Sequence, residues 1–189
     1  AATQWVKERV GNRGLWGLVN NAGVFPPLAY VEWMKPEDYM AAFQVNLFGM
    51  VQVTLSMLPL VKKARGRIVN VSSALGRISF CAGFYSCSKY GVEAFSDVLS
   101  DYHIGTHRSD LESWSSIYSN CKRLYKTYSA ADLSPVTDCL EHALTSTYPR
   151  TRYSAGWDAR FIFIPLSYLP TSLADYILTR SRRKPAQAV

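Results

Sequence analysis

The chain has 189 residues, of which 48% are hydrophobic and 19% are charged, and its formal net charge is +7. This length predicts one domain with a sizeable core, and the composition is that of a globular chain rather than a disordered one. The positive charge permits contact with anionic phosphates or lipids, but no basic stripe interleaved with aromatic residues accompanies it. Nucleic acid is therefore not an expected partner.

The cysteine pattern argues against a resident metal. Cys81, Cys87, Cys121 and Cys139 form no C-x-x-C pair and no other spacing typical of a metal site. Two histidines lie four residues apart, but no third ligand follows at a matching distance. We therefore expect free thiols and no metal.

The first elements are a helical pattern over residues 1–10 and a short apolar strand over 15–19, which ends at the NNAG stretch Asn20 to Gly23. Small and amide side chains at the carboxyl end of a strand suit a ligand crevice in an open α/β sheet. A glycine at position 23 would let the backbone approach a flat ring closely. A plain turn explains the same four residues equally well, so both interpretations stay open.

A long helix is predicted from Pro36 to about Lys63, because proline is favoured at the first helical position and apolar residues follow. Residues 43–61 carry no charge, but polar residues interrupt them and a proline lies near their end. We therefore expect a buried helix rather than a membrane span. Asn46 in its middle is either a satisfied core amide or a functional group.

The strongest candidate chemistry follows the second predicted strand, residues 67–71, which is short and β-branched. Ser73 lies at the end of this strand and could hydrogen-bond a substrate oxygen. A helical pattern opens at Tyr85, and Lys89 lies four residues on, so the two side chains share one helix face. An ammonium group beside a phenol favours the phenolate and lowers the pKa of the tyrosine, which makes an acid/base pair plausible.

The order helix, strand, helix, strand, helix predicts an α/β fold with a parallel sheet and covering helices. The NNAG stretch, Asn46, Ser73, Tyr85 and Lys89, in this order, resemble the short-chain dehydrogenase/reductase superfamily. More narrowly, the chain resembles its retinol and hydroxysteroid dehydrogenase branch, and the likeness is carried by LWGLVNNAGV, VKKARGRIVNVSS, SKYGVEAFSDVL and EHALTSTYPRTRYSAGWDA. The resemblance implies a Rossmann-like sheet.

The resemblance also implies catalytic roles. Tyr85 would be the general acid/base on the substrate hydroxyl, and Lys89 would lower its pKa and bind the nicotinamide ribose. Ser73 would hold the substrate oxygen. Asn46 would anchor a water that relays the proton outward.

The implied cofactor is NAD, which would accept a hydride from a hydroxysteroid such as an androgen, or from retinol. Asn20, Ala22 and Gly23 would line the adenosine side of the cofactor crevice, and Tyr85 and Lys89 would complete the cofactor contacts. The resemblance further implies association with the endoplasmic reticulum or microsomal membrane, on it or on its lumenal side, and a homodimer.

Two parts of the family pattern are missing from the sequence. No glycine-rich strand-turn-helix precedes Asn20, and residues 100–131 show no apolar β-run and no Pro-Gly. We therefore expect an incomplete sheet, without the N-terminal βαβ unit and one later strand. The expected regions are a partial dinucleotide-binding and catalytic core over 1–99, a divergent segment over 100–132 and a substrate-pocket, membrane-proximal region over 133–189. The alternative function is an inactive fragment or isoform that binds lipid or a partner chain.

The last region begins with a predicted helix whose N-cap is Ser134 and whose first residue is Pro135. Residues 161–173 are apolar, interrupted by prolines and too short to span a bilayer, and a basic cluster follows at 180–184. This region could rest on an anionic membrane, or it could be a core segment with a solvated basic tail.

Overall fold

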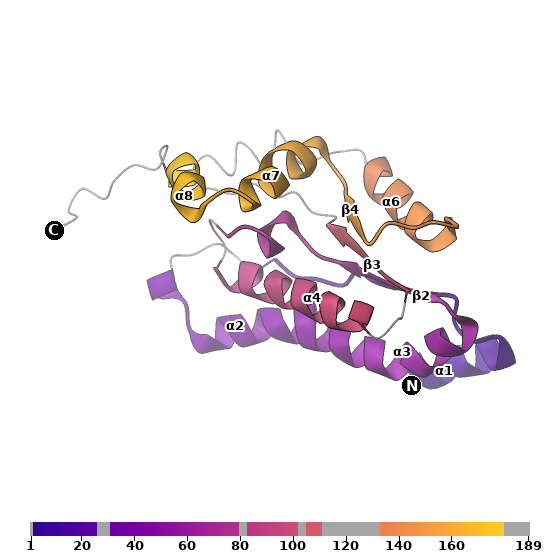
Figure 1. Ribbon diagram of the computed structural model, residues 1–189. Coiled ribbons are helices and arrows are strands. Elements are labelled where there is room, and N and C mark those ends of the chain that lie inside the picture. Colours follow the sequence, from indigo (N-terminus) through magenta and orange to yellow (C-terminus); the bar gives the residue numbers. More distant parts are fainter. Residues whose placement is uncertain (1, 26–30, 80–82, 102–104, 111–132, 180–189) are drawn as a thin grey trace.

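The computed structural model describes residues 2–25, 31–79, 83–101, 105–110 and 133–179, and all elements named below lie within these ranges (Figure 1). The strands are β1 (Gly17–Asn20), β2 (Arg67–Val71), β3 (Gly105–Asp110) and β4 (Arg152–Ser154). The α-helices are α1 (Ala2–Val10), α2 (Pro36–Phe43), α3 (Met50–Ala64), α4 (Gly83–Asp101), α6 (Ser134–Thr145), α7 (Ile164–Ser167) and α8 (Thr171–Thr179). Shorter helical segments are η1 (Gly11–Arg13), η2 (Val31–Trp33), η3 (Gln44–Gly49), η4 (Ala74–Gly76) and η5 (Ala159–Phe163).

The four strands form one parallel sheet in the order β1-β2-β3-β4. Asn20 at the end of β1 lies opposite Asn70 of β2. Because parallel strands end at the same edge, the NNAG stretch and the serines after β2 meet there. The parallel sheet with covering helices confirms the predicted fold class.

Alternate residues of β2 supply the core on the two faces of the sheet. Ile68 packs with Val61 of α3, whereas its neighbour Val69 packs with Ala143 of α6 and with Tyr153 of β4. All of these side chains are buried. This alternation follows from the two-residue period of a strand, and it explains why the neighbouring residues Ile68 and Val69 of β2 are both apolar.

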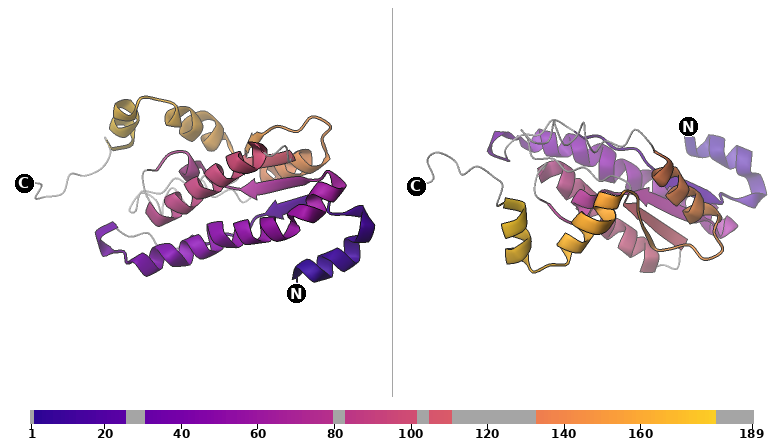
Figure 2. Two further views of the ribbon diagram at one scale, coloured as in Figure 1. Left: turned by 60° about the horizontal axis from the view of Figure 1, so that its bottom comes forward. Right: turned by 90° about the horizontal axis from the view of Figure 1, so that it is seen from above.

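The helices therefore lie in two layers with the sheet between them. Figures 1 and 2 show α2, α3 and α4 alongside one another on one face, and α6 on the other. The first helix, α1, lies against α3. The helices α2 and α4 meet through a cluster that includes Ala42, Phe84 and Tyr85. This cluster brings the predicted catalytic tyrosine into the core beside the long helix.

The long helix predicted from Pro36 is confirmed as the continuous run α2, η3 and α3. It ends at Arg65, whose left-handed backbone (φ 50°) turns the chain into β2. Among the described residues, Pro36–Ala64 is the one helical run long and apolar enough to cross a bilayer. Core helices pass the same test of length and composition, and this run packs on β1, β2 and α4.

Two expectations are corrected. Residues 105–110 form β3, between β2 and β4, in a segment where the absence of an apolar run led us to expect no strand. Residues 111–132 of that segment lie outside the described residues. The N-cap of α6 is Leu133, which makes no side-chain cap, and Ser134 is the first helical residue.

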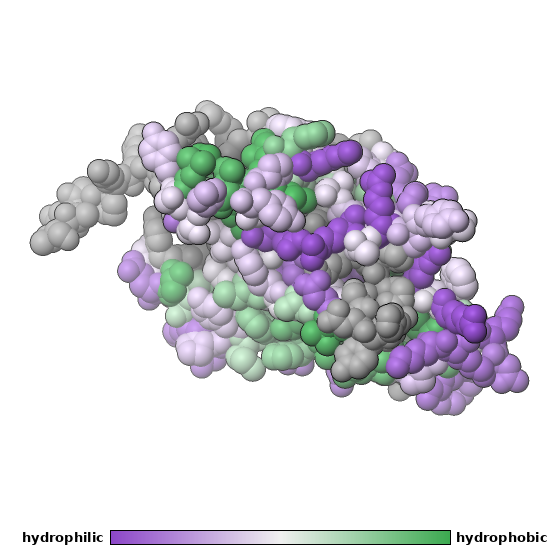
Figure 3. Space-filling view, viewed as in Figure 1, coloured by the Kyte–Doolittle hydropathy of each residue, from purple (hydrophilic) through white to green (hydrophobic). Residues whose placement is uncertain are grey.

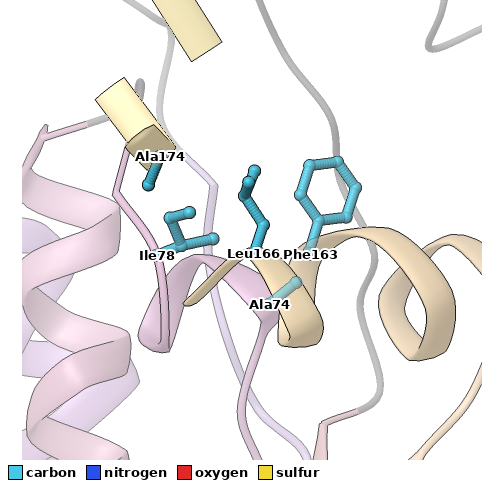
Figure 4. Packing of buried hydrophobic residues seen from close by; sticks show 5 residues of the cluster. All are labelled: Ala74, Ile78, Phe163, Leu166 and Ala174. Atoms are coloured by element: carbon cyan, nitrogen blue, oxygen red, sulfur yellow. The ribbon is translucent and has the colours of Figure 1, made fainter. Parts of the chain in front are cut away.

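The C-terminal segment packs on the loop that follows β2. Ala74 and Ile78, in and just after η4, form a buried cluster with residues of η5, α7 and α8, namely Phe163, Leu166 and Ala174 (Figure 4). Other apolar residues of the same segment are exposed, among them Phe161 at 67% and Tyr168 at 73%. The apolar stretch predicted at 161–173 is thus a core element on one side only.

Candidate active site

Ser73 lies at the carboxyl edge of the sheet, two residues beyond the end of β2. Its side chain is completely buried, and its hydroxyl accepts a hydrogen bond of 3.2 Å from the amide of Leu75. This bond caps η4, which begins at the next residue. The fold therefore fixes the Ser73 hydroxyl at the strand end, where the sequence predicted it.

Tyr85 and Lys89 share one face of α4, as their spacing predicted. The Nζ atom of Lys89 lies 5.6 Å from the centroid of the Tyr85 ring, and both residues are at most 3% exposed. Lys89 Nζ also donates a hydrogen bond of 3.1 Å to the carbonyl of Val71. The fold therefore places a buried ammonium group beside the phenol ring of Tyr85.

Asn46 lies in η3, a π-helical segment within the long helix, and is 2% exposed. Its Oδ1 accepts from the amide of Val24 at 2.7 Å, and its Nδ2 donates to the carbonyl of Val24 and to the hydroxyl of Ser88, each at 3.0 Å. Ser88 in turn donates to the carbonyl of Tyr85 at 2.7 Å. The side chain of Asn46 is therefore a satisfied core amide that ties the loop after β1 to α4.

Gly23 lies beside the side chains of Asn46 and Lys89. A Cβ atom on Gly23 would be 3.5 Å from the Oδ1 of Asn46 and 3.5 Å from the Nζ of Lys89. The glycine therefore leaves open a space beside the ammonium group that any side chain would fill. Phe25 contacts the ring of Tyr85 edge-on, with centroids 4.6 Å apart.

Asn20 is part of a buried polar chain beneath the site. Its Nδ2 donates to the hydroxyl of Thr54 at 2.9 Å and to the Oδ1 of Asn70 at 2.8 Å, and Asn70 donates to Ser96 at 2.8 Å. This chain joins α3, β1, β2 and α4. Ala22, two residues further on, is exposed.

The sequence analysis did not single out Thr54, Asn70, Ser88 or Ser96, although each is buried and hydrogen-bonded around the site. Their signal in the sequence is weak, because nothing in the pattern separates Ser88 or Thr54 from other polar residues of the same helices, such as Ser86 and Ser56. The partners in such a series of hydrogen bonds are fixed by strand register and helix packing, which spacing along the sequence does not reveal.

A comparison with known protein families matches more than half of the chain. A family model described as short chain dehydrogenase matches residues 1–106. The chain is 58% identical to 17-beta-hydroxysteroid dehydrogenase type 6 of Mus musculus, 56% to that of Homo sapiens and 51% to retinol dehydrogenase 7 of Mus musculus. Each alignment covers 100% of this chain and 71% of the relative.

The first of these alignments runs over 225 residues, more than the 189 of this chain. The relative therefore has residues within the aligned span that have no counterpart here. Among solved structures, a short-chain dehydrogenase from Streptomyces avermitilis has a TM-score of 0.72 at 20% identity, covering 97% of this chain and 76% of that one. The structure described as ElxO with NADP bound has a TM-score of 0.65 at 16% identity, covering 84% of this chain and 73% of that one. These two likenesses show the fold.

Proposed function

The chain belongs to the short-chain dehydrogenase family, and from this we propose that it oxidises the secondary alcohols of hydroxysteroids, such as androgens, and also retinol, with NAD as hydride acceptor. Its family makes it an oxidoreductase, and the names of its relatives support steroids or retinoids as substrates. The observation that carries the proposal is the buried ammonium group of Lys89, which lies beside the ring of Tyr85 and donates to the carbonyl of Val71, two residues before Ser73.

In the proposed reaction Tyr85 removes the proton from the substrate hydroxyl, while the carbon that bears this hydroxyl gives up a hydride to NAD. Lys89 favours the phenolate by its charge, and the hydroxyl of Ser73 hydrogen-bonds the substrate oxygen. Burial supports these roles, because an electrostatic interaction is stronger where water is excluded. The hydrogen bond by which Ser73 caps η4 supports the role of this serine, since it fixes the position of the hydroxyl oxygen.

The family uses nicotinamide cofactors, NAD or NADP, and our proposal is NAD. The fit is supported by Gly23, because the space that its missing Cβ leaves lies beside Lys89. We assign the cofactor contacts to Asn20, Ala22, Gly23, Tyr85 and Lys89. When bound, the nicotinamide ring supplies the hydride acceptor, and the residues of this chain orient the alcohol and move its proton.

We propose that Asn46 supports the proton path as well as the fold. Its side chain is engaged with Val24 and Ser88, so the contribution comes from the position that it gives to the loop after β1 and to the π-helical turn. Such turns inside α-helices frequently occur at functional sites. A water bound near this turn would carry the proton outward.

Membrane contact belongs to the same proposal, at the endoplasmic reticulum or microsomal membrane. The C-terminal segment exposes apolar side chains, including Phe161 in η5, Tyr168 just after α7 and Leu173 in α8, and a basic cluster follows them in the sequence. Figure 3 shows hydrophobic residues gathered over α7 and α8. Apolar side chains beside cations suit an anionic lipid surface. Co-sedimentation with vesicles that contain anionic lipid, compared with neutral vesicles, tests it.

We also propose a homodimer. The long helix exposes Met40, Phe48 and Leu55, at 58%, 46% and 56%. A second copy would cover these side chains. Sedimentation velocity of the wild type and of Phe48→Glu tests this, and a wild type that sediments as a monomer at micromolar concentration contradicts it.

A second candidate function is binding without catalysis. It is favoured by the length of the alignment, because the relative has residues that this chain lacks. A fluorescence titration of the chain with NADH separates the two functions. Saturable binding at micromolar concentration favours the dehydrogenase, whereas no binding together with vesicle or partner binding favours the second candidate.

The decisive experiment replaces Tyr85 by Phe and measures NAD-dependent oxidation of a hydroxysteroid and of retinol. Turnover should be lost while the circular dichroism spectrum and the thermal midpoint stay close to those of the parent. Tyr90→Phe is the matched control, since Tyr90 lies on the same helix and is 44% exposed. Normal turnover by Tyr85→Phe would show that the assignment is wrong.

A further inference from the structure

The loop after β2 is joined to α4 by an ion pair outside the site described above. Nε of Arg77, the residue that follows η4, lies 3.4 Å from Oε2 of Glu93. The side chains are 24% and 6% exposed, so solvent screens the pair less than a surface pair. Glu93 follows Lys89 by four residues and Tyr85 by eight, and it therefore belongs to the same stripe of α4.

Two further features join the same two segments. The hydroxyl of Ser72 donates a hydrogen bond of 3.5 Å to the carbonyl of Lys89. A Cβ atom on Gly76 would lie 2.9 Å from that carbonyl oxygen, so the backbone of η4 approaches α4 as closely as a glycine allows. Ser73 lies between these contacts. Its position relative to Lys89 therefore depends on how η4 sits on the helix.

On its other side the same segment contacts the C-terminal helices. Ala74 and Ile78 pack on Phe163 and Leu166, with Ala174 completing the cluster (Figure 4). Residues 72–78 thus lie between α4 and the region proposed to form the substrate pocket. A shift of η4 would move the serine and the neighbouring pocket wall together.

We propose that Arg77 and Glu93 are positioning residues, which hold η4 on α4 and so fix the Ser73 hydroxyl relative to Tyr85 and Lys89; this inference rests on the proposed function. Neither side chain contacts the reacting atoms in this scheme. Their effect passes through the serine, because Ser73 caps the same short helix that Arg77 follows and that the ion pair holds against α4. The pair also neutralises a carboxylate that the fold buries.

The test compares Glu93→Gln with Asp97→Asn. Asp97 lies one turn further along α4 and pairs with Arg152 at 3.3 Å, but its side chain is 63% exposed, which makes it a matched control. Two quantities are measured on the full chain: hydrogen exchange of the peptide 72–79, and kcat and KM for a hydroxysteroid and for NAD. Arg77→Lys, which keeps the charge at the more exposed partner, is the conservative variant.

In Glu93→Gln we expect the backbone amides of residues 72–79 to exchange about tenfold faster than in the parent chain, while exchange over α3 stays unchanged. Its kcat should fall by up to about 100-fold while the KM for NAD stays within about twofold. Asp97→Asn should match the parent, and Arg77→Lys should retain part of the lost kcat. If Glu93→Gln does not fold, Arg77→Met, made at the more exposed partner, is measured in the same way.

Unchanged exchange over 72–79, equal acceleration over the whole chain, or faster local exchange with unaltered kcat would each overturn the inference. A parent without turnover would instead show that the proposed function is wrong. In that case the exchange data still decide whether the ion pair holds η4 on α4. The two failures are therefore distinguishable.

Discussion

The ammonium group of Lys89 donates a hydrogen bond of 3.1 Å to the carbonyl of Val71, the last residue of β2. The same group lies 5.6 Å from the centre of the Tyr85 ring. One buried cation therefore links the helix that carries the phenol to the strand that leads to Ser73. This link joins the fold to the proposed chemistry, because the charge that holds the strand end in place also acts on the phenol.

Replacing Lys89 by Met should lower turnover by about 10²- to 10⁴-fold, the usual contribution of acid/base catalysis. The remaining activity should require a higher pH, because removal of a positive charge disfavours the phenolate. A pH-rate profile measured between neutral and alkaline pH checks this. Lys62→Met, at an exposed position of α3, is the control, and a profile that does not move would contradict the role of Lys89.

Asn46→Ala should reduce the free energy of unfolding by about 1–3 kcal/mol, because it leaves the amide and carbonyl of Val24 without the partners that Asn46 provides. Urea denaturation measures the change. Gln44→Ala, in the same π-helical turn but exposed, should change stability by less than about 0.5 kcal/mol. Equal effects of the two substitutions would mean that the Asn46 amide does not hold the loop.

Two glycines near the site should respond differently to alanine. At Gly23 the new Cβ would make ordinary contacts of 3.5 Å, so folding should tolerate it while affinity for NADH falls. At Gly76 it would lie 2.9 Å from the carbonyl of Lys89 and from the hydroxyl of Ser72, so the free energy of unfolding should fall by about 1–3 kcal/mol. Thermal unfolding and NADH fluorescence separate the two effects. A Gly23→Ala variant with unchanged affinity would remove Gly23 from the proposed cofactor contacts.

The sequence predicted the elements whose residues carry their own local signal. β2 was predicted at 67–71 because this stretch is short, β-branched and bounded by Gly66, and the long helix because of its proline start and apolar run. The shared face of Tyr85 and Lys89 follows from helix geometry alone. The carboxyl-edge position of Ser73 needed only the direction of the preceding strand.

What the sequence did not reveal depends on contacts between distant segments. β3 reads GTHRSD, which has no apolar run, and it is a strand because β2 and β4 pair with it on both sides. The pair of Arg77 and Glu93 likewise arises only when η4 packs on α4. The engaged side chain of Asn46 could not be told from a free one by its position in a helix, because its partners come from another loop and helix.

The thiol of Cys139 should react slowly with alkylating reagents near pH 8. Burial raises the pKa of Cys139, the charge of Asp138 raises it further and that of Arg150 lowers it, so the neutral thiol is favoured in the folded chain. Alkylation by iodoacetamide, followed by mass spectrometry, should therefore speed up as the pH rises above the usual thiol range and when the chain is unfolded in urea.

The sign of this shift also sets its effect on folding. A pKa that is higher in the folded chain stabilises the fold while the thiol is neutral, and that stabilisation is lost as the pH rises through the folded-state value. The exposed thiol of Cys87 on α4 is the internal control in the same sample. Equal alkylation rates of Cys87 and Cys139 in the folded chain would mean that α6 does not shield Cys139 as the structure describes.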